Sequence, residues 1–241
     1  MIRLIAALSL LICTFVTAKE FIVGVEAIRY YPLFDFQNND ISQPSFTKDL
    51  LTDFFETHQY EYRLVPLPIK RFDKWYLEQG IDFKFPDNIR WRENNSLNIT
   101  FSDPVLELMA GTYVLKKNAK LTRESVDALG TILGFFPTLW LDRLKAGQMT
   151  LHEESTPLGV VKHLLHGNVD ATNIDENVIR HNLALLGKPG EIVLNTQIHH
   201  EKYNYHFSTV NYPEVIEKFN LYLQDNEDKI NQLKVKYNIS P

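Results

Sequence analysis

The sequence predicts an α/β protein made of two lobes. Two observations lead to this prediction: short β-prone runs alternate with amphipathic helical segments, and this alternation occurs once in each half of the chain. A content of 44% hydrophobic and 23% charged residues is that of an ordinary globular protein. A chain of 241 residues with this composition can bury a core without cross-links.

The first 18 residues are expected to be a cleaved signal peptide. Arg3 gives a positive start, residues 4–16 are almost wholly apolar, and Ala18 is a small residue before the cut. The apolar run is shorter than the roughly 20 residues that span a bilayer, and an uncleaved membrane anchor is the alternative. Cleavage before Lys19 removes Cys13, the single cysteine of the chain, so the mature protein would have no thiol and no disulfide.

The first lobe is expected from residues 19–108. It begins with a strand at 21–25, and apolar residues then recur at helical spacing over 46–55. A strand-like alternation at 60–66 and a short helix at 72–77 follow. Strand, helix, strand, helix is the order of a parallel sheet with covering helices.

The second lobe is expected from residues 109–202. Strands are predicted at 131–136, 149–152 and 170–173, and helices at 139–144, 156–166 and 176–186. Two extended segments, 106–115 and 203–209, are interpreted as strands that cross between the lobes. Residues 203–241 would then return to the first lobe as the crossing strand and two terminal helices with apolar stripes.

Charge and motifs argue against several functions. A formal charge of −5 attracts neither nucleic acid nor an anionic membrane, so neither is expected as a partner. Glycine-rich phosphate loops and the Gly-x-Ser-x-Gly elbow are absent from the sequence. His163 and His166, one helical turn apart, and the adjacent His199 and His200 suggest zinc only weakly, because spacing fixes no third ligand. We expect no enzyme, no metal and no cofactor.

Three short motifs carry a resemblance to a known family. They are Tyr31-Pro32-Leu33-Phe34-Asp35-Phe36 after the first strand, Phe101-Ser102-Asp103-Pro104 before the first crossing strand, and Gly167-Asn168-Val169-Asp170-Ala171 after a helix of the second lobe. In this order the chain resembles the bacterial extracellular solute-binding proteins of family 3, typified by the polar amino-acid receptors of ABC transporters.

The resemblance implies a fold and a function. The fold would be that of type II periplasmic binding proteins, α/β with two lobes joined by two crossing hinge strands. The function would be periplasmic binding of a small polar, amino-acid-like solute between the lobes, and delivery to an ABC permease of the inner membrane. A monomer is expected. The alternative is the same fold used as a ligand-sensing or interaction module that signals to a membrane sensor.

The resemblance also suggests where a ligand would bind. Asp175 stands where the family has an acidic residue that pairs with the ligand's ammonium, although it could instead, or also, cap the helix that follows. Tyr31 and Phe36 lie in a loop at a strand end, where open α/β sheets bind ligands, and their rings could cover a ligand. Trp75 is a further aromatic candidate. Packing inside the lobe is the alternative for all three rings.

This sequence departs from the family pattern at the residue that supplies the positive charge of the binding site. The family's Thr-x-x-Arg, whose arginine clamps a carboxylate with two parallel hydrogen bonds, is absent before Phe101. Arg92 is the nearest substitute and Arg90 the next, with an ion-paired surface arginine as the alternative. The usual Gly-Thr or Gly-Ser pair of the second lobe is also missing, so Thr138 is the remaining hydroxyl candidate there. Arg71, near a strand end, ranks below Arg92.

Overall fold

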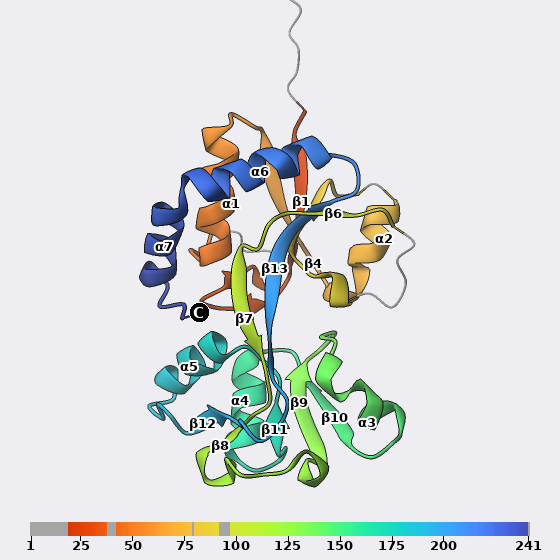
Figure 1. Cartoon of the computed structure of the whole chain (residues 1–241), viewed down its shortest axis with the longest axis vertical. Coiled ribbons are helices and arrows are strands. Elements are labelled where there is room, and N and C mark those ends of the chain that lie inside the picture. Colours follow the sequence, from red (N-terminus) through yellow and green to blue (C-terminus); the bar gives the residue numbers. More distant parts are fainter. Residues whose placement is uncertain (1–18, 38–41, 79, 92–96, 241) are drawn as a thin grey trace, which may run out of the picture.

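The computed structural model describes residues 19–37, 42–78, 80–91 and 97–240. Two α/β lobes lie one above the other, and two long strands run between them (Figure 1). These strands are β7 (Leu106–Ala110) and β13 (Glu201–Thr209). The chain passes from the first lobe to the second after β7 and returns along β13.

The sheet of the first lobe has the strand order β4-β1-β5-β13-β6, and β7 pairs with β13 beside it. β1 pairs in parallel with β4 and β5, whereas β13 runs antiparallel to β5, β6 and β7. A two-stranded ribbon of β2 and β3 follows β1. The bounds are β1 (Phe21–Glu26), β2 (Arg29–Tyr30), β3 (Phe34–Asp35), β4 (Tyr62–Leu67), β5 (Phe83–Asp87) and β6 (Thr100–Phe101).

Helices α1 (Phe46–Thr57), α2 (Phe72–Leu77), α6 (Pro213–Asp225) and α7 (Glu227–Lys236) belong to the first lobe (Figure 1). α1 begins after Ser45, whose hydroxyl accepts a hydrogen bond from the backbone N–H of Lys48. One face of α1 is wholly buried because its apolar residues recur at helical spacing. On that face the Phe54 ring packs edge-on against Phe219 of α6.

The sheet of the second lobe has the order β10-β9-β11-β8-β12. α4 (Pro157–Leu165) begins after Thr156, whose hydroxyl accepts from the N–H of Gly159, and proline takes the first helical position. The remaining bounds are β8 (Tyr113–Leu115), β9 (Ala128–Ile132), β10 (Thr150–Glu154), β11 (Ala171–Thr172), β12 (Ile192–Leu194), α3 (Leu141–Lys145) and α5 (Glu176–Leu185).

The predicted architecture, two α/β lobes joined by two crossing strands, is confirmed. The expected crossing strand at 106–115 is two strands in different sheets, because the chain leaves the first lobe at Gly111. The strand predicted at 131–136 ends at Ile132, and Gly134 takes a positive φ of 94° in the turn that follows. The expected lobe boundaries at 108 and 202 both fall inside the crossing strands.

Replacing Phe54 by alanine is expected to lower the free energy of unfolding by about 3–5 kcal/mol. The side chain is fully buried, and its removal leaves a cavity between α1 and α6. Urea unfolding measures the change. Val235→Ala, at a side chain that is 80% exposed, is the control and is expected to change stability by less than about 0.5 kcal/mol. Equal effects of the two substitutions would contradict this packing.

Candidate functional site

The two lobes touch each other on both sides of a central cavity. On one side the backbone N–H of Asp175, in the second lobe, donates to the Tyr30 hydroxyl of the first lobe over 2.7 Å. On the other side Lys70 Nζ lies 3.8 Å from Glu153 Oε1. Gly134 of the second lobe lies against Ile69 of the first lobe there, since a Cβ at Gly134 would be in van der Waals contact with Ile69 Cβ, at 3.4 Å. The lobes are therefore closed on one another.

The cavity between these contacts has a volume of about 240 Å³. Both lobes and both crossing segments supply its walls, and aromatic rings make up a large part of them. The first lobe contributes Glu26, Tyr30, Phe72, Lys84 and Trp91, the second Phe135, Phe136, Thr138, Trp140 and Asn173, and the crossing segments Ala110, Gly111, Tyr203 and Tyr205. Apolar and aromatic walls with a few polar groups are typical of small-molecule sites.

Two charged side chains of the first lobe lie side by side in the wall. Glu26 ends β1 and Lys84 lies on β5, and the register of these parallel strands pairs Gly24 with Lys84. Glu26 is two residues beyond Gly24, so both side chains project from the same face of the sheet. Both are buried, with exposed fractions of 3% and 6%. Strands, rather than loops, therefore fix the charged wall.

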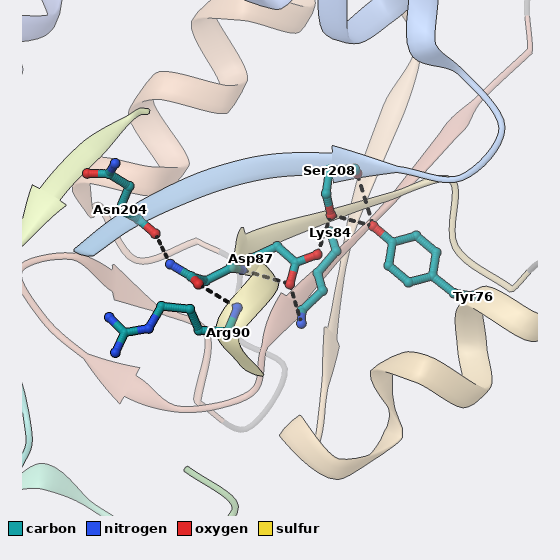
Figure 2. Close-up of polar contacts among 7 residues, drawn as sticks. Tyr76, Lys84, Asp87, Arg90, Asn204 and Ser208 are labelled. Atoms are coloured by element: carbon teal, nitrogen blue, oxygen red, sulfur yellow. Dashed lines mark hydrogen bonds and ion pairs between the residues drawn. The ribbon is translucent and has the colours of Figure 1, made fainter. Parts of the chain in front are cut away.

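Lys84 is held by a buried network (Figure 2). Its Nζ donates to Asp87 Oδ1 over 3.0 Å and lies 4.8 Å from the centre of the Phe72 ring and 5.6 Å from that of Trp91. Asp87 also accepts from the Ser208 hydroxyl, at 2.6 Å, and from the backbone N–H of Asn88, at 2.9 Å. Since an ammonium group has three N–H donors, two donors of Lys84 have no acceptor among the described residues.

Burial dominates the protonation of Glu26. Loss of water around the carboxyl raises its pKa to about 7; Lys84 opposes this rise and the negative charge of Asp87 adds to it. Within the described residues the Glu26 carboxyl has no hydrogen bond and no ion pair. Near neutral pH the Glu26 carboxyl is therefore present in both its protonated and its ionised form.

The wall from the second lobe contains unsatisfied polar atoms. Trp140 Nε1 and Asn173 Oδ1 are buried and have no hydrogen-bond partner in the part of the chain that the structure describes. Both residues line the cavity, as does Thr138. A buried donor or acceptor without a partner costs free energy, and a ligand could satisfy these two.

The residues suggested by the sequence occupy different environments. Thr138 lines the cavity, whereas Tyr31, Phe36, Arg71, Trp75 and Asp175 are not in its wall. Arg92 lies outside the described residues, and Arg90 is ion-paired with Glu201 of β13.

The aromatic candidates in the first lobe pack against other side chains, and Arg71 lies on the surface. The Tyr31 ring packs 4.5 Å from that of His181, at the contact between the lobes. Phe36 is fully buried and stacks on Phe34. Trp75 packs beside Phe72 and Tyr76, and Arg71 is exposed. Their ligand-binding role stays a prediction.

Asp175 caps α5: its Oδ1 accepts from the backbone N–H of Asn177 over 2.8 Å. The side chain is buried, and burial raises its pKa to about 6 although the hydrogen bonds from Asn177 oppose the rise. Its backbone N–H, as described above, holds Tyr30 of the opposite lobe. A role in binding an ammonium group stays a prediction.

Sequence reasoning missed Glu26 and Lys84. A charged residue at the end of the apolar run 21–25 was the available signal for Glu26. For Lys84 it was the alternation of Phe83, Lys84 and Phe85, which is typical of a strand. No group of three or more His, Cys, Asp or Glu side chains suited to a metal ion occurs among residues 19–37, 42–78, 80–91 and 97–240. Over the same ranges, no helix has the length and apolar character needed to cross a membrane.

No protein-family model and no curated protein sequence matches the chain. Solved structures do match. A mutant of ArgBP from T. maritima has a TM-score of 0.70 at 16% identity, with 92% of this chain and 96% of that chain covered. ArtJ from Geobacillus stearothermophilus, a protein that binds arginine, lysine and histidine, has a TM-score of 0.69 at 17% identity, with 91% and 95% covered.

A third similar structure is the ancestral amino acid-binding protein AncCDT-1, a precursor of cyclohexadienyl dehydratase, with a TM-score of 0.68, 18% identity, and 90% and 95% of the two chains covered. These neighbours have the type II periplasmic-binding-protein fold, and this chain has it too. The resemblance read from the three sequence motifs thus holds at the level of the fold. Most of the similar structures are binding proteins rather than enzymes.

The stability of the empty protein is expected to fall as the pH rises from about 4 to above 7. Glu26 and Asp175 have raised pKa values of about 7 and about 6 in the folded protein, against ordinary values of 4.5 and 3.8. The folded state therefore binds their protons more tightly, and the stability they contribute is complete below pH 4 and lost as they ionise. Urea unfolding at pH 5 and pH 8 measures this, and Glu26→Gln should reduce the difference. An unchanged difference in that variant would contradict the assignment.

Proposed function

We propose that this protein binds a small polar, amino-acid-like solute between its two lobes, without turnover, and delivers it to an ABC permease. The observation that carries the proposal is the cavity of about 240 Å³ whose wall is shared by both lobes and flanked by contacts between them. A ligand there is touched by both halves of the molecule and is shielded from water by closure.

A ligand bound between two lobes increases the population of the closed form of the protein. A ligand that contacts both lobes binds the closed form more tightly than the open form, and it shifts the equilibrium by that difference in affinity. The binding free energy is thereby converted into a shape that a membrane partner can recognise. The crossing strands β7 and β13 are the segments that would bend.

We take Lys84 as the anchor for a carboxylate of the solute. It replaces the arginine that the family pattern leads one to expect, and two of its N–H donors are free of acceptors in the described residues. An ammonium group is a point charge, so it holds a carboxylate with less directional control than a guanidinium fork. Thr138, Asn173 and Trp140 would supply the polar contacts from the second lobe.

The proposed location is the periplasm. Residues 1–18 have the composition of a signal peptide, and the fold is shared with periplasmic binding proteins such as one from Legionella pneumophila. Pull-down with membranes from the producing cell would separate an ABC permease from a sensor kinase as the partner. Recovery of a sensor alone would favour the signalling alternative.

Solute binding is expected to raise the melting temperature of the purified protein, because a ligand that binds only the folded state stabilises it by mass action. Thermal scans with amino acids, small peptides, polyamines and organic acids test this. A compound at about 100 times its Kd contributes roughly 2.7 kcal/mol. If the folded protein shows no shift with any of these classes, the binding proposal fails.

Thr138→Val is expected to weaken binding of whichever solute raises the melting temperature, by up to about tenfold, because a hydrogen bond contributes roughly 0.5–1.5 kcal/mol. The substitution keeps the shape of the side chain and removes its hydroxyl from the cavity wall. Titration calorimetry measures the affinity. Thr150→Val, on the exposed surface of β10, is the matched control. The same affinity in both variants would remove Thr138 from the site.

A further inference from the structure

We propose that the segment 238–240, which follows α7 of the first lobe, ties that lobe to α5 of the second lobe and holds the two lobes closed before any solute binds. The inference rests on the proposed solute-binding function and adds a conformational device to it. It concerns the balance between the open and the closed form of the protein, whatever the solute is.

The segment 238–240 is bound to α5 through its backbone. In the first turn of α5, the side-chain oxygen of Asn177 accepts from the backbone N–H of Ser240 over 2.8 Å, and Asn177 Nδ2 donates to the Ser240 carbonyl over 3.5 Å. The guanidinium of Arg180, one turn further along α5, donates to the backbone carbonyl of Asn238 and, over 2.7 Å, to Asn177 Oδ1. Two side chains of the second lobe therefore bind backbone groups of a first-lobe segment, and one of them, Asn177, is only 4% exposed.

The same segment is anchored in the first lobe. Asn238 takes a positive φ of 52°, which asparagine tolerates better than most residues, and the chain leaves the helical path of α7 there. Ile239 is 8% exposed within the apolar core, and its backbone N–H donates to the Lys234 carbonyl of α7 over 2.9 Å. Just before the segment, the Tyr237 hydroxyl donates to Asp49 of α1 over 2.6 Å. The segment is therefore fixed to the first lobe as well as bound to the second.

The neighbouring contacts between the lobes involve the same part of α5. Asp175 caps α5, and its backbone N–H donates to the Tyr30 hydroxyl. The Tyr31 ring lies 4.5 Å from the ring of His181, on α5, and 6.2 Å from that of Tyr237. Figure 1 shows the chain after α7 reaching down toward α5. The beginning of α5 is thus held by the β2–β3 region and by the segment 238–240 together.

Opening of the lobes has to break these bonds. α5 moves with the second lobe and the segment 238–240 is fixed to the first, so bending of β7 and β13 separates Asn177 and Arg180 from Ser240 and Asn238. The closed form therefore has hydrogen bonds that the open form lacks, one of them from a charged donor, and they favour closure without a solute. The apparent affinity for a solute that binds the closed form rises with the fraction of closed protein.

Distances between spin labels on the two lobes, measured without solute, test the proposal. The chain from Lys19 onwards contains no cysteine, so Val235→Cys on α7 and Leu185→Cys on α5 can carry the labels. Both side chains are mostly exposed, at 80% and 66%. Pulsed electron paramagnetic resonance gives the populations with a short and a long distance. We expect the labelled protein without further substitutions to show mainly the short distance.

In the labelled protein, Asn177→Ala should lower the ratio of closed to open molecules at least about fivefold, because it removes both bonds to Ser240. Arg180→Ala should shift the ratio in the same direction. A chain that ends at Tyr237 should shift it furthest, because it loses every bond between the segment and α5. Circular dichroism shows which variants fold, and the two substitutions in α5 make the test independent of either one.

Asn182→Ala is the matched control and should leave the ratio unchanged. This asparagine is also buried in α5, but its amide donates to the Val178 carbonyl of the same helix. The inference is overturned if Asn177→Ala and Arg180→Ala both keep the original ratio, or if the protein without these substitutions is mainly open. It is also overturned if the control opens the protein as far as they do, because loosening of α5 alone would then cause opening.

These outcomes are independent of the test of the proposed function. The distances are recorded without solute, so they report on the segment 238–240 even where no compound raises the melting temperature. An absent thermal shift with a closed, segment-dependent distance rejects solute binding and keeps the inference. A thermal shift with unchanged distances in both α5 variants rejects the inference and keeps solute binding.

Discussion

The antiparallel pairing of β7 with β13 is the interaction on which the arrangement of the molecule depends. Five residue pairs, from Glu201 with Ala110 to Tyr205 with Leu106, join the segments on which the chain crosses between lobes. The same β13 also pairs with β5 and β6 of the first sheet. One strand therefore anchors a lobe, spans the gap and carries Tyr203 and Tyr205 to the cavity. The distance between the lobes and the position of the aromatic wall follow from it.

The charged wall of the first lobe is built from the same sheet. Lys84 tolerates burial because Asp87, three residues along β5, supplies the opposite charge, and Ser208 of β13 satisfies the other carboxylate oxygen. A buried ion pair contributes little net stability, but it fixes where the ammonium lies. The polar atoms of the second lobe line the same cavity from the other side. The cavity is thus bounded by a strand-borne charged wall on one lobe and by polar and aromatic groups on the other.

Much of the fold could be predicted from the sequence, because local patterns determine it. The apolar spacing over 46–55 and the helices predicted at 156–166 and 72–77 correspond to α1, α4 and α2. β5 was not predicted, because a lysine and a proline inside Phe83–Asp87 obscure a buried strand. Lys84 is buried only through partners that the fold brings to it. For the same reason the sequence pointed to Arg90 and Arg92, rather than to Lys84, as the cation of the site.

Asp175 illustrates how one residue can serve both local structure and a contact between the lobes. A carboxylate at the start of a helix can accept hydrogen bonds from the helix's own backbone N–H groups and from a bound ligand. Here the backbone N–H of Asn177 donates to the Asp175 carboxylate, and the backbone N–H of Asp175 donates to the Tyr30 hydroxyl of the opposite lobe. The cap uses one carboxylate oxygen and the contact to Tyr30 uses the backbone N–H, so neither contact excludes a ligand ammonium at Asp175. The Glu26 carboxyl lies on the opposite lobe, where it lines the cavity and is buried.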